Sequence, residues 1–327
     1  MMRLIEAVPN LSEGRNFAAL DDIQRRLNEL PNLWLLGVDS NVDAHRSVFT
    51  MVGTIEGVEE GLLRLYEDSI EHLDMTRHQG VHPRIGAVDV CPLVPLGETT
   101  HKEAEALVRR LAKKIWEEFE IPVSFYQKSA KPGERENLAY LRRGGFEGLP
   151  ERLATGFQPD VGEAKPHPKA GMTIMGVRDF LIAYNINLGR ADLNDARQLA
   201  TKLRHARDRE QNSNLQGVDI LGWYLEEHGL AQISCNVRDY LHCGIADVFF
   251  EVKRQALDMD IRVTGSEIVG MLPIKALVMK PDGDPKLQLA QVFEAALALG
   301  LDDFQSFDPQ TKIIEYRLKA LGGPNEI

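Results

Sequence analysis

The feature that most constrains the fold is a repeated order of predicted strands and helices in the two halves of the chain. Strand-like apolar runs alternate with segments whose apolar residues recur every three or four positions, as on the buried face of a helix. In the first half we predict a strand at 3–11, a helix at 16–30, strands at 33–39 and 47–53, a helix at 58–73 and a strand at 85–96. In the second half we predict a strand at 180–188, a helix at 192–207, strands at 218–223 and 231–236, a helix at 247–259 and a strand at 260–265. Both halves therefore have the order β-α-β-β-α-β.

This order predicts an α+β protein of two similar β-α-β-β-α-β subdomains, each a mixed sheet with helices mainly on one face. We place the subdomains at residues 1–178 and 179–327, and the length of 327 residues suits two domains of ordinary size. Each half adds a helix and a strand to the repeat. The first adds a helix that starts at Thr100, with Thr100 and Glu103 at the spacing of a capping box, and a strand at 121–126. The second adds a helix at 287–299 and a last strand at 313–318.

The composition excludes several classes of protein. With 43% hydrophobic and 27% charged residues the chain can build real cores. Its 38 basic and 49 acidic residues give a formal net charge of −11, which argues against a general nucleic-acid binder. Cys91, Cys235 and Cys243 are an odd number without CxxC spacing, which favours a reducing compartment over disulfides or zinc. Glu6 interrupts the short apolar N-terminus, and no apolar run approaches a membrane span, so we expect a soluble cytoplasmic protein.

The least regular stretch, residues 155–173, lies between the two halves and contains three glycines and three prolines. Loops of this length in compact domains are usually functional or are plain linkers. The segment Lys165-Pro166-His167-Pro168-Lys169 puts two cations and an imidazole on backbone that the prolines stiffen. This content favours a binding role over a plain connector.

Several common catalytic signatures are absent from the sequence. It has no GxxxxGK[ST], GxGxxG, GxSxG or HExxH motif. His78 and His82 have the i,i+4 spacing of helical metal ligands, but Gly80 lies between them and Pro83 follows. A helix there is disfavoured, so we expect no metal at this pair.

His82 is the histidine whose surroundings best suit proton transfer. It precedes Pro83, which favours extended backbone, and in extended chain the side chains of His82 and Arg84 share a side. A guanidinium nearby disfavours the imidazolium, so the ring would be neutral near pH 7 and able to accept or relay a proton. The alternative is a structural histidine, and spacing alone leaves both open. Cys91 follows in an apolar strand, where we expect a buried, unreactive thiol.

Four long stretches carry a resemblance to a known family. The chain resembles glutamate formimidoyltransferase, the transferase domain of formiminotransferase-cyclodeaminase, over nearly all its length. The stretches are Val8-Pro9-Asn10-Leu11-Ser12-Glu13-Gly14-Arg15, the segment from Arg77 to Pro92, the segment Phe180 to Leu188, and the segment Gly265 to Leu277, before an Ile313-Ile314-Glu315-Tyr316 ending.

The resemblance implies transfer of a formimidoyl group between N-formimidoyl-L-glutamate and tetrahydrofolate, in histidine degradation and one-carbon metabolism. It places the catalytic histidine, a proton donor, at His82. It also implies two similar α+β subdomains that flank a substrate tunnel, and a homodimer. Tetrahydrofolate is then a co-substrate, and no metal is implied. The folate-binding segment falls on Gly162, Glu163, Ala164, Lys165, Pro166, His167, Pro168, Lys169, Ala170 and Gly171.

The chemistry fits such a site without a covalent nucleophile. One amine attacks an amidine carbon, and the other leaves only when protonated, so a positioned acid/base group is the minimum requirement. Both substrates carry carboxylates, which arginines bind well, and Arg84, Arg178 and Arg190 are the candidates.

Three alternatives remain at this point. Formyl transfer from 5-formyltetrahydrofolate to glutamate needs the same site and differs by one heteroatom. Hydrolysis of formimidoylglutamate would replace folate with water. A non-catalytic folate-binding module would make His82 dispensable.

Overall fold

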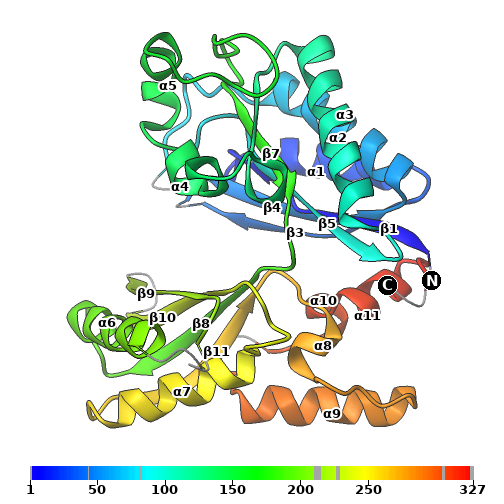
Figure 1. The fold of residues 1–327 in the computed structure, drawn as a ribbon. Coiled ribbons are helices and arrows are strands. Elements are labelled where there is room, and N and C mark those ends of the chain that lie inside the picture. The colour runs from blue at the N-terminus through cyan, green and yellow to red at the C-terminus, as the bar shows by residue number, and fades with distance from the viewer. Residues whose placement is uncertain are drawn as a thin grey trace. The chain divides into compact units, whose positions relative to one another are not determined.

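The computed structural model describes residues 2–42, 44–80, 83–209, 215–225, 229–303 and 306–324. By its internal contacts the chain divides into two compact units. The first comprises the described residues up to Arg178 and a short C-terminal piece from Leu321, and the second spans Asp179–Ala320. Each unit has its own hydrophobic core. Each also has its own sheet, as Figure 1 shows.

The sheet of the first unit is mixed. Across it, β3 pairs with β4, β4 with β1 and β2, and these with β5, all antiparallel. Beyond β5, the pairings β5–β7 and β7–β6 are parallel. The strand predicted at 3–11 divides at Pro9, which has no N–H for the ladder. The strands are β1 (Arg3–Ala7), β2 (Asn10–Leu11), β3 (Leu33–Asn41), β4 (Arg46–Gly53), β5 (Val88–Gly97), β6 (Val123–Phe125) and β7 (Thr173–Val177).

Three long helices pack on one face of this sheet, as predicted: α1 (Phe17–Asn28), α2 (Ile55–His72) and α3 (His101–Phe119). The side chains of Asn16, Thr54 and Thr100 cap them by accepting a backbone N–H of the first turn. The predicted capping box of Thr100 and Glu103 is confirmed. The apolar stripes of the three helices enter one core with Cys91 and Met175 of the sheet.

A short helical extension, which the sequence analysis did not predict, packs on the other face. It comprises two 3₁₀ turns, Gln127–Ser129 and Glu134–Glu136, and the helices α4 (Leu138–Leu141) and α5 (Gly145–Ala154). Leu141 and Leu149 contact a second cluster with Val90 and Ile174, the strand neighbours of Cys91 and Met175. Because successive side chains of a strand point to opposite faces, the end of the sheet at β5 and β7 is covered on both sides.

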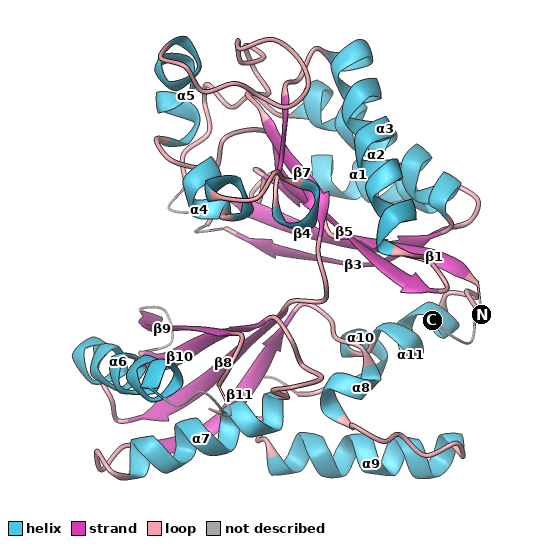
Figure 2. Ribbon diagram, in the orientation of Figure 1, coloured by secondary structure: helices cyan, strands magenta, loops and turns pink. Residues whose placement is uncertain are grey.

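The second unit is a complete β-α-β-β-α-β fold with the sheet order β11-β8-β10-β9. Figure 2 shows α6 and α7 on the same side of this sheet, where their apolar residues share one core with Tyr184 and Ile186. Every described strand pair of this sheet is antiparallel. The elements are β8 (Ile182–Gly189), α6 (Leu193–Arg209), β9 (Val218–Leu225), β10 (Leu230–Val237), α7 (Ile245–Leu257) and β11 (Arg262–Val269).

The predicted repeat is confirmed in the order of elements and also in space. In the first unit β5, β1, β4 and β3 lie side by side, which are the fourth, first, third and second strands of the repeat. The same 4-1-3-2 order gives β11-β8-β10-β9 in the second unit. The expected mixed sheet occurs in the first unit, where β7 and β6 are added in parallel. The second sheet is antiparallel instead, because its described strands are the four strands of the repeat.

The second unit ends in helices, and the strand predicted at 313–318 is wrong. This segment forms α11 (Ile314–Ala320), in which Ile314 and Leu318 are both buried one helical turn apart. Its apolar residues fit a strand and a helix almost equally well, so the short pattern could not decide. The preceding helices are α8 (Ile274–Leu277), α9 (Pro285–Ala298) and α10 (Pro309–Lys312). None of the helices in the described part of the chain is long and apolar enough to span a membrane.

Candidate functional site

His82, the predicted catalytic residue, lies outside the described residues together with Val81. The site can therefore be built from the residues on either side. Gly80 lies so close to the loop between β3 and β4 that a Cβ atom would stand 2.6 Å from the carbonyl oxygen of Ala44. On the other side, Ile85 and Ala87 are fixed in the protein interior.

Arg84 has a guanidinium that is already bound by protein groups. Its Nη1 and Nη2 donate to the two carboxylate oxygens of Glu147 at 2.9 and 2.6 Å, a bidentate pair. The hydrogen bond from Arg84 is the main reason that the pKa of Glu147 lies below its usual value. Its Nε donates to Nδ1 of His78 at 2.9 Å. A substrate carboxylate at Arg84 would therefore have to share or displace Glu147.

His78 is buried and held as a neutral ring. Nδ1 accepts from Arg84, so Nε2 carries the proton and donates to the carbonyl oxygen of His45 at 2.9 Å. Burial lowers the pKa of His78, and the nearby charges of His45 and Arg84 lower it further. Both ring nitrogens are thus in use, which leaves none free for a metal ion. Among the described residues, no group of three or more His, Cys, Asp and Glu side chains is placed to hold one.

His45 and Glu13 form an ion pair beside His78. Nδ1 of His45 faces the carbonyl oxygen of Gln79 at 2.9 Å and Nε2 faces Oε1 of Glu13 at 3.0 Å. Both partners of the ring are acceptor oxygens. Burial alone would raise the pKa of Glu13, but hydrogen bonds from the backbone and from His45 outweigh it, and the pKa is lowered. Three successive backbone N–H groups, of Gly14, Arg15 and Asn16, donate to the same Oε1 at 2.8–2.9 Å.

Glu13, His45, His78, Arg84 and Glu147 are connected by hydrogen bonds. Of these five residues the sequence analysis singled out only His78 and Arg84. Three loops supply Glu13, His45 and the pair His78 and Arg84, and the first turn of α5 supplies Glu147. Glu13 lies inside one of the stretches that resemble the family, which is the one signal that could have found it. Nothing in the local pattern marks His45, which has a left-handed backbone with φ of +50°.

A second polar cluster surrounds Asp89 on β5. This carboxylate is buried, accepts the N–H of Ile85 at 2.9 Å, and is bound by Nη2 of Arg142. Arg46 lies near both: burial and the charge of Arg142 lower its pKa to about 10. The three side chains form a cluster with two cations and one anion, which suits an incoming carboxylate.

Arg178, a predicted carboxylate ligand, lies at the end of β7, next to the same region. Its side chain meets the buried hydroxyl of Tyr126, whose pKa burial raises to about 12. Arg142 is a further neighbour of Tyr126, so Arg178 belongs with the Asp89 cluster. Arg190, by contrast, lies in the second unit, on an exposed turn after β8 with φ of +61°. Within the first unit the structure therefore brings together Arg178, Arg142 and Arg46, whereas Arg190 belongs to the second unit.

The predicted folate-binding loop, Gly162–Gly171, is fixed against the segment that follows Arg84. The N–H of Ala87 donates to the carbonyl oxygen of Ala170, and Met172 donates to Ile85, at 2.9 and 3.1 Å. Gly86 and Gly171 form an antiparallel bridge. Neither has room for a side chain, because a Cβ on either would stand 2.2 Å from a backbone oxygen. Backbone hydrogen bonds therefore hold the end of the loop, Ala170–Gly171, against Ile85–Ala87.

Within the loop, His167 and the backbone make a tight turn. His167 and Gly171 exchange two backbone hydrogen bonds of 2.9 Å, and Nδ1 of His167 accepts the N–H of Ala170 at 2.9 Å. Burial lowers the pKa of His167 and so favours the neutral, accepting ring. Lys165 and Lys169 are exposed, as a role in binding an anion would require.

The second unit presents a polar network on the sheet face opposite α6 and α7. Gln232 is central: its Nε2 donates to Asn187 and Glu267 at 2.8 and 3.0 Å, and its Oε1 accepts from Trp223 at 2.9 Å. Asn185 donates to the same Glu267 oxygen at 2.9 Å. Asn185 and Asn187 alternate with the core residues of β8, so the sequence did contain this signal. Such a face can orient a polar ligand through amide groups.

Comparison with known proteins identifies the family. Residues 4–178 match the family model of the formiminotransferase domain, N-terminal subdomain, and residues 183–319 match that of the formiminotransferase domain. The glutamate formimidoyltransferase of Streptococcus pyogenes serotype M1 is 37% identical over 85% of this chain and 92% of its own length. That of Thermoplasma acidophilum is 34% identical over 85% of this chain and 90% of its own length.

Longer relatives match as well. The formimidoyltransferase-cyclodeaminase of Mus musculus is 38% identical over 98% of this chain, which spans 61% of the mouse protein. With both subdomain models matched over most of its length, the chain belongs to the formiminotransferase domain family.

Proposed function

We propose that this protein transfers the formimidoyl group between N-formimidoyl-L-glutamate and tetrahydrofolate. Relatives covered over nine tenths of their length carry the name of this activity. The observation that carries the proposal is the attachment of Gly162–Gly171 to Ile85–Ala87. The loop expected to bind folate and the segment that follows the expected catalytic histidine lie together in one unit.

The reaction requires groups that this chain can supply. A new C–N bond forms to N5 of tetrahydrofolate and the C–N bond to the glutamate nitrogen breaks. N5 gives up a proton, and the departing nitrogen takes one. We assign this exchange to His82, as general acid and base. The chain holds the reactants through positive charge near Asp89, from Arg46, Arg142 and Arg178, and through the backbone of the folate loop.

The proposal extends to the solution state of the protein. We propose a homodimer in the cytoplasm, with formimidoylglutamate and tetrahydrofolate as its small-molecule substrates. Light scattering coupled to size-exclusion chromatography tests the dimer directly, since a mass of one chain at micromolar concentration contradicts it.

Turnover of formimidoylglutamate with and without tetrahydrofolate tests the function. We expect glutamate release that depends strictly on tetrahydrofolate, with one formimidoyl-folate formed per glutamate. Release without folate would indicate hydrolysis and contradict the proposal. Folate binding without turnover would indicate a binding module. A parallel assay with glutamate and 5-formyltetrahydrofolate measures formyl transfer, which we expect to be the slower reaction.

A further inference from the structure

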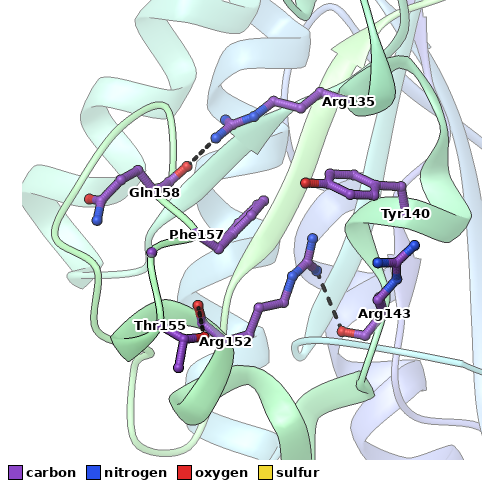
Figure 3. A pocket seen from close by; sticks show the side chains of 8 residues that line it. Arg135, Tyr140, Arg143, Arg152, Thr155, Phe157 and Gln158 are labelled. Atoms are coloured by element: carbon purple, nitrogen blue, oxygen red, sulfur yellow. Dashed lines mark hydrogen bonds between the residues drawn. The ribbon is translucent and has the colours of Figure 1, made fainter.

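A pocket of about 510 Å³ lies in the α4–α5 extension of the first unit, apart from the residues assigned above. Figure 3 shows it: Arg135, Arg143 and Arg152 line it together with Tyr140 and Phe157. No residue of the folate loop, the His45–His78 pair or the Asp89–Arg46–Arg142 cluster is among the residues that line it. Its volume is in the range of small-molecule sites.

The two aromatic rings hold the three guanidinium groups by their faces. Arg152 lies over Phe157 at 4.0 Å and over Tyr140 at 5.1 Å, measured to the ring centroids. Arg135 lies over Phe157 at 5.0 Å and Arg143 over Tyr140 at 5.3 Å. Stacking on a ring uses the face of a guanidinium and leaves the N–H groups at its edge for hydrogen bonds.

The positive charge in this pocket exceeds the negative charge. Arg135 has a carboxylate partner, Asp160, at 2.7 Å. Among the described residues, no carboxylate pairs with Arg143 or Arg152. Arg152 donates Nη1 to the carbonyl oxygen of Leu141 at 2.5 Å, while its buried Nη2 meets no acceptor in hydrogen-bonding geometry. Burial lowers the pKa of Arg152 most, the neighbouring Tyr140 hydroxyl opposes this shift, and the charges of Arg143 and Arg135 add to it.

Two neighbouring guanidinium groups without a carboxylate partner lower the stability of the fold unless an anion offsets their charge. The chain has a net charge of −11, yet no carboxylate of its described residues pairs with Arg143 or Arg152. A buried guanidinium nitrogen without an acceptor costs free energy, and an anion that accepts from it would offset this cost. The rings keep the guanidinium groups in place, so little side-chain freedom is lost on binding.

We propose that this pocket binds a small polyanion, a phosphorylated or polycarboxylic metabolite, whose oxygens accept from the edges of Arg143 and Arg152. Guanidinium groups pair in this way with both phosphate and carboxylate oxygens. The site is separate from the proposed transferase site, and its existence does not depend on that function.

Isothermal titration calorimetry of the full chain at low ionic strength tests the proposal with two probes, pyrophosphate and tricarballylate. We expect at least one probe to bind, and the tighter one indicates a phosphorylated or a polycarboxylic occupant. Arg143→Gln should weaken binding about fivefold and Arg152→Gln about tenfold or more. Addition of 0.3 M NaCl should weaken binding to the wild type, since salt screens such contacts.

Arg109→Gln is the matched control. Arg109 also stacks on an aromatic ring, Phe125, at 5.2 Å, but it is paired with Glu105 outside the pocket. We expect this variant to bind like the wild type. Arg152→Gln loses a hydrogen bond to the carbonyl oxygen of Leu141 and could unfold. Arg143→Gln then decides, because the guanidinium of Arg143 stacks on the Tyr140 ring at the pocket and has no ion pair among the described residues. The proposal is overturned if neither probe binds, or if Arg143→Gln and Arg109→Gln bind equally, which would place the anion elsewhere.

Discussion

The imidazole rings of His45 and His78 are stacked, with centroids 4.2 Å apart and planes 12° from parallel. Their hydrogen bonds differ: both nitrogens of His45 face acceptor oxygens, whereas Nδ1 of His78 accepts from Arg84 and its Nε2 donates. A second proton on His78 would charge a buried ring beside Arg84 and would break the hydrogen bond from Arg84. The stack is therefore stable only while His78 is neutral.

The first prediction concerns the pH dependence of stability. The unfolded chain protonates His78 near 6.5, whereas the folded protein holds its pKa lower. Between these two values the unfolded state binds more protons, so the free energy of unfolding should fall as the pH drops below about 6.5. Urea unfolding at several pH values from 8 to 5 measures this. His78→Gln keeps a donor and an acceptor without titrating, and its stability should vary less over the range.

His205→Gln is the control for this experiment, because His205 is exposed on α6. It should keep the pH dependence of the wild type. An identical pH profile for His78→Gln and the wild type would show that His78 does not contribute.

The second prediction concerns the hydrogen bonds that the Glu13 carboxylate accepts. Glu13→Ala removes the acceptor of three backbone N–H groups and of His45, and should lower the free energy of unfolding by about 2 kcal/mol. The stabilisation by Glu13 is present above about pH 4.5, its ordinary pKa, and is lost as the pH falls through the lowered value of the folded state. Denaturant unfolding at pH 7 measures it. Glu118→Ala on the exposed side of α3 should change stability by less than about 0.5 kcal/mol, and equal effects would contradict the prediction.

The third prediction concerns catalysis. His82→Ala should lower kcat by about 10²–10⁴-fold, as expected for a general acid and base, while the affinity for tetrahydrofolate changes little. Steady-state kinetics with both substrates varied, and fluorescence titration of folate, measure the two effects. His205→Ala should have wild-type kcat. A near wild-type kcat for His82→Ala at saturation would show that another group transfers the proton.

The fourth prediction concerns the lysines of the folate loop. Lys165→Ala combined with Lys169→Ala should raise the KM for tetrahydrofolate several-fold, and more for polyglutamylated forms, while the KM for formimidoylglutamate is nearly unchanged. The reason is attraction between exposed lysines and the glutamyl carboxylates, which salt screens over about 8 Å at physiological ionic strength. Lys102→Ala combined with Lys113→Ala, both exposed on α3, is the control. If both double variants behave alike with mono- and polyglutamylated folate, the loop lysines do not contact the tail.

The fifth prediction concerns the bridge between Gly86 and Gly171. A Cβ at position 86 would stand 2.2 Å from the backbone oxygen of Met172, so Gly86→Ala must displace the loop. We expect a loss of about 1–3 kcal/mol of stability together with weaker folate binding. Gly148→Ala, inside α5 with no neighbour within 4 Å of the added atom, should instead stabilise by about 0.5–1 kcal/mol. Thermal unfolding and folate titration compare the two, and a Gly86→Ala protein that binds folate like the wild type would contradict the prediction.

The extent to which the sequence predicts this fold differs from element to element. α3 was predicted because its capping box and its apolar stripe are local signals that agree. β7 was not, since five buried residues after a glycine- and proline-rich stretch have no period of their own. α11 was predicted as a strand because seven residues are too few to separate the two periods.

Two parts of the candidate site, the residues around His82 and the loop at 162–171, are continuous stretches of sequence. The resemblance to the family could therefore point to both. The pairing of Glu13 with His45 joins residues 32 positions apart through loop backbone, and no periodicity encodes it. The described contacts of Arg84 are with His78 and Glu147, and the predicted proximity of Arg84 to His82 stays a prediction because His82 lies outside the described residues.

The way the 162–171 loop is attached has a consequence for how its specificity can be changed. Its main fixing points are hydrogen bonds between backbone atoms, from Met75 to Lys169, from Ala87 to Ala170 and between His167 and Gly171. Substitution of a side chain removes none of these bonds, so the exposed positions 163, 165 and 168 can be exchanged while the chain keeps its path. The loop is therefore suited to saturation mutagenesis or to transplantation of side chains from a relative, with Gly86, His167 and Gly171 left in place. Under the proposed role of the loop in folate binding, selection at these exposed positions would change the preference for the folate tail while the backbone stays as it is.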